Sequence, residues 1–106
     1  MLYRVYNSGE IPPLAHGWRF DAASRQCTHP RETALTLTDK ESLLLAALLA
    51  NTGGVTRDQL IRDIWAHESG VTSHTLETHI YRLRQKLERI DGLTIAAHDN
   101  GYVLQA

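Results

Sequence analysis

The apolar residues between positions 76 and 90 constrain the fold of this chain most, because their spacing suits a helix. They follow one another at intervals of 4, 3, 4 and 3 residues: Leu76, Ile80, Leu83, Leu87 and Ile90. At about 100° per residue, these side chains form one stripe along a helix. We therefore expect a long helix from about residue 72 to residue 89 that buries this stripe.

Two capping patterns predict two further helices before it. Thr38 is followed three residues later by Glu41, which forms a capping box ahead of a leucine-rich helix over residues 39–50. Thr56 opens the same pattern in front of a shorter amphipathic segment. Only the connection 66–71 separates the short helix from the long one, and this close spacing is typical of a helix-turn-helix.

Both ends of the chain have the short apolar groups and turn residues of strands. At the start, glycine and proline interrupt three such groups, at residues 2–6, 16–20 and 34–37. They predict a small antiparallel sheet. At the other end, two apolar segments flank an Asn-Gly pair, which predicts a β-hairpin.

The order of these elements predicts an α+β winged helix-turn-helix fold. With 106 residues, the chain has the length of one domain with one core. We expect a small antiparallel sheet over residues 1–37, a three-helix core over 38–90 and a C-terminal hairpin, the wing, over 93–105.

Length and composition exclude several other classes. The longest apolar run, residues 43–50, is too short to cross a bilayer, and the first nine residues lack the pattern of a signal peptide. We therefore expect a cytoplasmic protein. Cys27 is the single cysteine, so the fold has no internal disulfide.

Six histidines raise the question of a metal site, but their spacing argues against one. His74 and His79 are separated by about 140° on a helix, so they do not point at one ion. No nucleophile turn, glycine-rich phosphate loop or paired carboxylate is present. We expect no metal, no cofactor and no enzymatic activity.

The charge of the chain makes any nucleic-acid site a local one. The net charge is -1, yet the segment 73–89 holds four basic residues of the chain's 11 against two carboxylates. The face opposite the apolar stripe carries no carboxylate and consists of His74, Thr78, Tyr81, Arg82, Gln85 and Arg89. Flanking positions hold Thr75, His79 and Lys86 on one side and Glu77, Arg84 and Glu88 on the other, so the acids are kept to the edge of this face.

These side chains can donate hydrogen bonds to phosphates and base edges. Arg82 suits bidentate contact with guanine, and Gln85 suits bidentate contact with adenine. A helix of this width fits the major groove. Two alternatives stay open at this point: the segment is only a solvated amphipathic helix, or its outer face binds a protein instead of DNA.

Four segments carry a resemblance that covers residues 37–104. They are LTDKESLLLAALL, GGVTRDQLIRDIW, SHTLETHIYRLRQKL and NGYVL. In order and spacing they resemble the winged-helix effector domain of the OmpR/PhoB class of bacterial response regulators. The resemblance implies sequence-specific binding of double-stranded DNA in transcription regulation.

The resemblance also implies roles for single residues. Arg82 would read a base, and five other residues match positions that contact the DNA backbone or base edges in that class: His74, Thr75, His79, Tyr81 and Arg84. The wing departs from the class, which commonly has an arginine there. Here His98 and Asn100 flank Asp99, so we expect wing contacts to be weak.

Partners follow from the same resemblance. The class has an upstream receiver domain with a phosphorylatable aspartate, part of a two-component phosphorelay, which pairs effector domains on repeated half-sites. We expect an effector domain separated from such a receiver, with a natural single-domain relative as the alternative. We further expect weak DNA binding as a monomer, dimers on DNA, and contact between the loop 66–71 and RNA polymerase.

Overall fold

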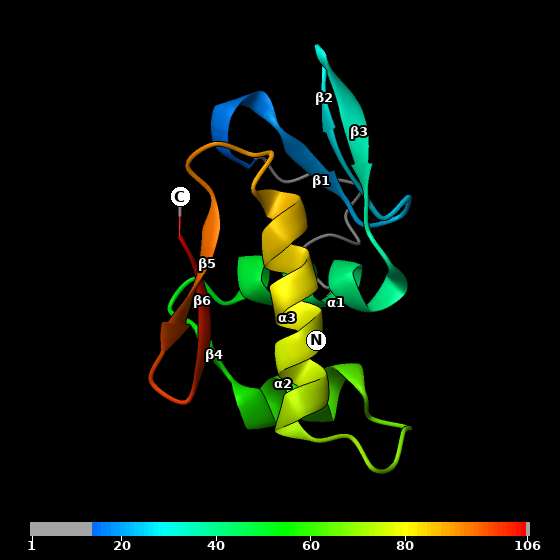
Figure 1. The fold of residues 1–106 in the computed structure, drawn as a ribbon, viewed down its shortest axis with the longest axis vertical. Helices are drawn as coiled ribbons and strands as arrows, with labels where there is room; N and C mark the ends of the chain where they lie inside the picture. Colours follow the sequence, from blue (N-terminus) through cyan, green and yellow to red (C-terminus); the bar gives the residue numbers. More distant parts are fainter. Residues whose placement is uncertain (1–13, 106) are drawn as a thin grey trace.

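The computed structural model describes residues 14 to 105 of the chain. The strand expected over residues 2–6 lies outside the described residues. The fold within them contains two small sheets and three helices (Figure 1). This arrangement confirms the predicted α+β winged helix-turn-helix architecture.

The first sheet consists of three antiparallel strands in the order β1-β2-β3. Their bounds are Arg19–Asp21 for β1, Gln26–His29 for β2 and Glu32–Thr36 for β3. Phe20, Cys27 and Leu35 lie opposite one another across the sheet and are all buried. This row of three side chains forms the contact of the sheet with the core.

One part of the predicted sheet is different in the structure. Residues Ala15–Gly17 form a short 3-10 turn, η2, instead of a strand. His16 and Gly17 both have positive φ angles, 54° and 85°, which extended backbone does not allow. The first described strand therefore begins only at Arg19.

The first helix, α1, has the predicted bounds, Asp39–Ala50. Its capping box is complete: the Thr38 hydroxyl accepts a hydrogen bond from the Glu41 amide at 3.2 Å, and the Glu41 carboxylate accepts one from the Thr38 amide at 2.8 Å. Because the cap involves residues only three apart, the sequence alone was sufficient to predict it.

The second and third helices form the helix-turn-helix. Helix α2 spans Arg57–Ile64, and the Thr56 hydroxyl caps it by accepting a hydrogen bond from the Gln59 amide. Helix α3 spans Ser73–Leu87 and ends about two residues earlier than predicted. All five residues of the predicted apolar stripe, including Ile90 just beyond the helix, are buried.

The second sheet includes the wing and one strand that the sequence did not indicate. Strands β5, Thr94–His98, and β6, Gly101–Gln105, form the predicted hairpin. The two-residue strand β4, Val55–Thr56, pairs with β6 and gives the order β4-β6-β5. At Gly101 a side chain would clash with the Val55 carbonyl oxygen, so this close pairing requires a glycine.

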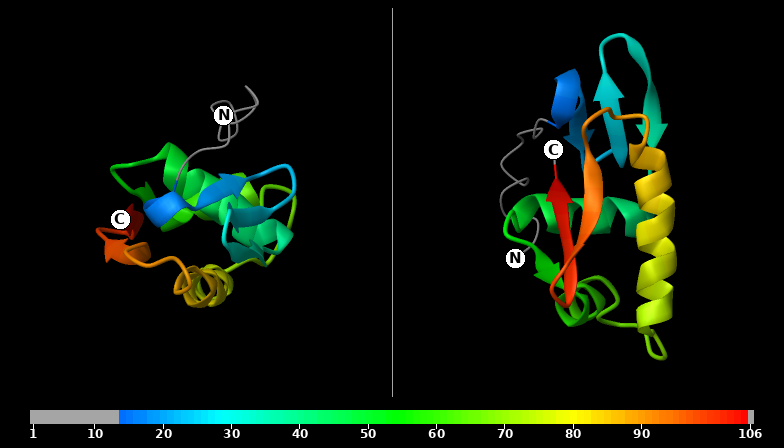
Figure 2. Two further views of the ribbon diagram at one scale, coloured as in Figure 1. Left: turned by 90° about the horizontal axis from the view of Figure 1, so that it is seen from above. Right: turned by 60° about the vertical axis from the view of Figure 1, so that its left-hand side comes forward.

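Helix α3 stands at one side of the molecule. Its first turns lie beside α2, and its last turns lie near the first sheet (Figure 1). In the two views of Figure 2, one side of α3 packs on the rest of the chain and the other is open. The fold therefore leaves the outer face of this helix uncovered by the other helices and strands.

Candidate nucleic-acid interface

The centre of the outer face of α3 is exposed. Tyr81 has 58% of its surface accessible, and His74, Arg82 and Gln85 are also exposed. Within residues 14–105, no hydrogen bond, ion pair or ring contact engages the Arg82 guanidinium. Arg82 therefore offers its five N–H donors to an external acceptor.

Two of the polar residues on this face contact each other. The Gln85 side-chain amide donates a hydrogen bond to the Tyr81 hydroxyl oxygen at 3.1 Å. These residues are four apart, so their side chains lie on the same side of the helix. Their contact fixes the arrangement of the most exposed part of α3.

Thr78 and His79 instead bond to the backbone of their own helix. The Thr78 hydroxyl donates to the His74 carbonyl oxygen at 3.0 Å. His79 Nδ1 lies 2.8 Å from the Thr75 carbonyl oxygen, which only accepts, so Nδ1 carries the proton. The His79 ring packs edge-on against Trp65, with ring centroids 5.2 Å apart. Thr75, Thr78 and His79 are half-buried and border the exposed centre.

Lys86 contacts the core rather than open solvent. Its ammonium lies 2.6 Å from a carboxylate oxygen of Glu41 and 3.2 Å from the Thr36 carbonyl oxygen. Burial by itself would raise the pKa of Glu41, but hydrogen bonds from Lys86 and Thr38 and the charge of Lys86 hold this pKa below its ordinary value. Lys86 is thus the counter-ion of a buried carboxylate.

Arg89 lies just beyond the end of α3, and its side chain contacts the first sheet. Because α3 ends at Leu87, the helical spacing that placed Arg89 beside Arg82 does not extend to it. Its guanidinium donates to the Thr33 carbonyl oxygen at 2.7 Å and lies over the Trp18 ring, 5.5 Å from the centroid. Arg89 therefore joins the end of α3 to the first sheet.

Arg84 links α3 to the wing. Its Nε donates a hydrogen bond to the Ile95 carbonyl oxygen in β5 at 3.0 Å. The side chain is half-buried. This contact fixes the position of the wing relative to the outer face of the helix.

The wing turn carries His98 and Asn100, the two wing residues that the sequence indicated as candidates for DNA contact. His98 and Asn100 are exposed, and between them Asp99 adopts a positive φ of 50°. His98 Nε2 lies 3.6 Å from the Asp99 carboxylate, so a protonated His98 would be partly neutralised. The Asn100 carbonyl oxygen accepts a hydrogen bond from the Arg57 amide at 2.8 Å, which attaches the turn to the start of α2.

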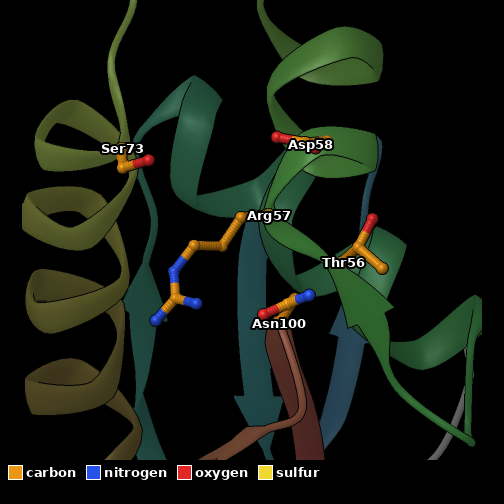
Figure 3. A pocket seen from close by; sticks show the side chains of 5 residues that line it. All are labelled: Thr56, Arg57, Asp58, Ser73 and Asn100. Carbon is orange, nitrogen blue, oxygen red and sulfur yellow. The ribbon is translucent and has the colours of Figure 1, made fainter.

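A polar pocket of about 270 Å³ lies between the starts of α2 and α3 and the wing turn. Its lining residues are Thr56, Arg57, Asp58, Ser73 and Asn100. The Arg57 side chain extends into the space between α3 and Asn100 (Figure 3). Its guanidinium lies over the Tyr102 ring, 5.3 Å from the centroid.

Sequence reasoning did not identify Arg57 as a candidate. In the sequence it is an ordinary first-turn residue of a short helix. Pairing of β4 with β6 brings it to the wing, and this pairing was not predicted. Its position beside α3 adds one cation to the candidate interface.

Neither a metal site nor a membrane-spanning helix is found among residues 14–105. No group of three histidine, cysteine or carboxylate side chains is placed to hold a metal ion there. None of the helices in that range has the length and apolar character needed to cross a membrane.

A helix that presents an exposed outer face without a carboxylate, follows a short helix and is flanked by a hairpin defines a winged helix-turn-helix domain. A family model described as "Transcriptional regulatory protein, C terminal" matches residues 32–104. The chain therefore belongs to this family. Membership confirms the predicted resemblance to OmpR/PhoB-type response regulators and the prediction of a DNA-binding domain in transcription regulation, and it agrees with the expectation of no enzymatic activity.

Individual relatives are regulators of the same kind. The transcriptional regulatory protein VxrB of Vibrio cholerae is 37% identical over 87 residues, which cover 81% of this chain and 34% of VxrB. The heme response regulator HssR of Staphylococcus aureus is 36% identical over 74 residues, 67% of this chain and 33% of HssR. The chain spans about a third of the length of these relatives.

A solved structure shows the same fold. The DNA-binding domain of Escherichia coli CadC has a TM-score of 0.73 and 27% identity, over 92% of this chain and 95% of that domain. Unlike the two regulators, the CadC domain matches this chain over nearly its whole length.

Proposed function

We propose that this chain reads DNA with the outer face of α3 in the major groove, with Tyr81, Arg82 and Gln85 over the base edges. The observation that carries the proposal is the Arg82 guanidinium, exposed and without a partner within residues 14–105. An arginine so placed suits bidentate contact with guanine O6 and N7. The exposed His74 lies near the start of the same helix and suits a contact with the DNA backbone.

The pocket beside α3 suits the phosphate backbone. Arg57 supplies a cation there, and Ser73 and Asn100 supply neutral donors on either side. Asp58 also lines the pocket, so the phosphate would lie nearer to Arg57 than to the acid. Of the wing residues, Asn100 is the better donor toward DNA because Asp99 lies against His98.

The number of available cations sets the expected strength of binding. Arg84, Lys86 and Arg89 already donate within the chain, which leaves Arg82 and Arg57, the latter over the Tyr102 ring, as the main cations available to DNA. Because Arg82 is assigned to a base, the one phosphate contact from Arg57 would give a slope of about -1 for log affinity against log salt. Binding by one copy would then be weak, and two copies on repeated half-sites would strengthen it.

Three further parts of the proposal concern a receiver domain, RNA polymerase and the location of the protein in the cell. A receiver domain in a phosphorelay would control pairing, and the exposed loop 66–71 would contact RNA polymerase. These roles rest on the family, because the loop itself contains only small and polar exposed residues up to Gly70. A cytoplasmic location follows from access to the chromosome.

The test is an NMR titration of the labelled chain with duplex DNA at low and moderate salt. We expect shifts of the amides of Thr78, Arg82 and Gln85, and of Arg57, that become smaller as salt increases. A folded chain that shows no shift at low salt would reject DNA binding and favour a protein partner for α3.

A further inference from the structure

Tyr81 and Gln85 are both exposed, and their side chains contact each other on the outer face of α3. Tyr81 is the one large hydrophobic residue among positions 14–105 that is classed as exposed. Leaving an aromatic ring in water has no benefit for stability. Its position beside Gln85, on the face proposed to meet DNA, makes the pair available for binding.

The hydrogen bond leaves the Gln85 amide able to recognise a base. One of its two N–H groups goes to the Tyr81 hydroxyl oxygen, at 3.1 Å. The carbonyl oxygen and the second N–H stay free. One acceptor and one donor are what the major-groove edge of adenine requires, since N6 donates and N7 accepts.

The same bond leaves Tyr81 with a free donor. Its hydroxyl oxygen accepts from Gln85, so its own hydrogen points elsewhere. The neighbouring Thr78 hydroxyl donates to the His74 carbonyl oxygen. The Tyr81 ring also offers an apolar surface for a thymine methyl group.

If the Gln85 side chain is already held in place, less conformational entropy is lost when DNA binds. A free glutamine side chain rotates about several bonds, and ordering such a side chain in an interface weakens binding by roughly two- to tenfold. Tyrosine has only two rotatable bonds and loses little freedom. A tyrosine that already orients the amide removes part of this cost before DNA arrives.

We propose that Tyr81 is a specificity-determining residue that orients the Gln85 amide to read adenine in an A·T pair. This inference rests on the proposed function. Tyr81 acts mainly through Gln85. The two residues together recognise one base pair, and Arg82 recognises a different one.

The experiment uses the 106-residue chain and a pool of random-sequence DNA duplexes. Selection with the unaltered chain defines a preferred duplex, and each base pair of that duplex is then changed in turn. Affinities are measured for the unaltered chain, Tyr81→Phe, Gln85→Ala and the double variant. Arg82→Ala is the matched control on the same face.

We expect one A·T pair whose preference disappears in Gln85→Ala and falls roughly two- to tenfold in Tyr81→Phe. In the Gln85→Ala background, Tyr81→Phe should have no further effect on that pair. Arg82→Ala should relax preference at a different pair. In the free chain, the Gln85 side-chain amide should become more mobile by ¹⁵N relaxation in Tyr81→Phe.

Two outcomes overturn the inference in distinguishable ways. If the unaltered chain selects a sequence but Tyr81→Phe keeps full discrimination at every base pair, only the inference fails. If the folded chain selects no sequence and binds no duplex, the proposed function fails with it.

Discussion

The ammonium of Lys86 lies 2.6 Å from the carboxylate of Glu41, joining the last turn of α3 to the first turn of α1. Glu41 is almost completely buried, with 2% of its side chain exposed, and it also caps α1. One ion pair therefore connects α3 to the N-terminal cap of α1.

Replacing Lys86 by methionine should destabilise the fold. The buried Glu41 carboxylate would lose its counter-ion, at a cost of about 1 to 3 kcal/mol, a value reduced because Lys86 is one-third exposed. Urea unfolding would measure the change in the free energy of unfolding. The double variant Lys86→Met/Glu41→Gln should cost less than the sum of the two single variants, and strict additivity would contradict the coupling.

The same pair predicts a dependence of stability on pH. The pKa of Glu41 in the folded chain lies below its ordinary value of 4.5, so folding favours the ionised carboxylate. This stabilisation is present above that ordinary value and is lost as the pH falls through the lower pKa of the folded state. Glu41→Gln should therefore flatten the decrease in unfolding free energy in acid. An unchanged acid profile would exclude this contribution.

Replacing Arg82 by alanine should weaken binding to a preferred duplex by about 1 to 3 kcal/mol and relax specificity at one base pair. Arg31 is an exposed residue in the turn between β2 and β3, far from the outer face of α3 (Figure 1). Arg31→Ala removes the same charge and is the matched control. Equal losses for the two variants, measured by fluorescence anisotropy, would mean that Arg82 contributes only charge.

Replacing Arg57 by alanine should have a different signature from Arg82. A phosphate contact is independent of sequence, so affinity should fall alike for all duplexes and the salt slope should decrease by about one. Arg57→Lys keeps the positive charge, so its slope of log affinity against log salt should be close to that of the unaltered chain. Loss of preference at a single base pair in Arg57→Ala would argue for a base contact instead.

Replacing Gly101 by alanine should disturb the wing sheet. The added methyl group would clash with the Val55 carbonyl oxygen and lie 2.7 Å from the Thr56 Cα, which predicts a loss of about 1 to 3 kcal/mol. Gly53 is the matched control, since a methyl group there meets nothing within 4 Å. Thermal unfolding should show Gly53→Ala within about 1 kcal/mol of the unaltered chain.

Local patterns in the sequence predicted the helices and the wing well. The Thr38–Glu41 cap defined the start of α1, and the apolar stripe identified the buried side of α3, because both depend on residues close in the chain. Strand β4 was missed because two residues give no periodicity, and its pairing with β6 joins positions far apart in sequence.

The candidate interface was predicted less completely for a related reason. A helical projection shows which side a residue faces, but it does not show which distant groups lie there. Lys86 and Arg89 meet Glu41 and Thr33, which are more than forty residues earlier in the chain. The local excess of basic residues on α3 thus overstated the charge available to DNA, and Arg57 was overlooked.

The residues that anchor α3 and the residues proposed to read DNA are different sets. Arg84, Lys86 and Arg89 bond to the wing, to α1 and to the first sheet, whereas Tyr81, Arg82 and Gln85 make no hydrogen bond or ion pair with another element among residues 14–105. Substitutions at the second set leave the helix attached. Under the proposed function, substitutions at Tyr81, Arg82 and Gln85 should redirect the domain to new operators while the fold keeps its anchoring contacts.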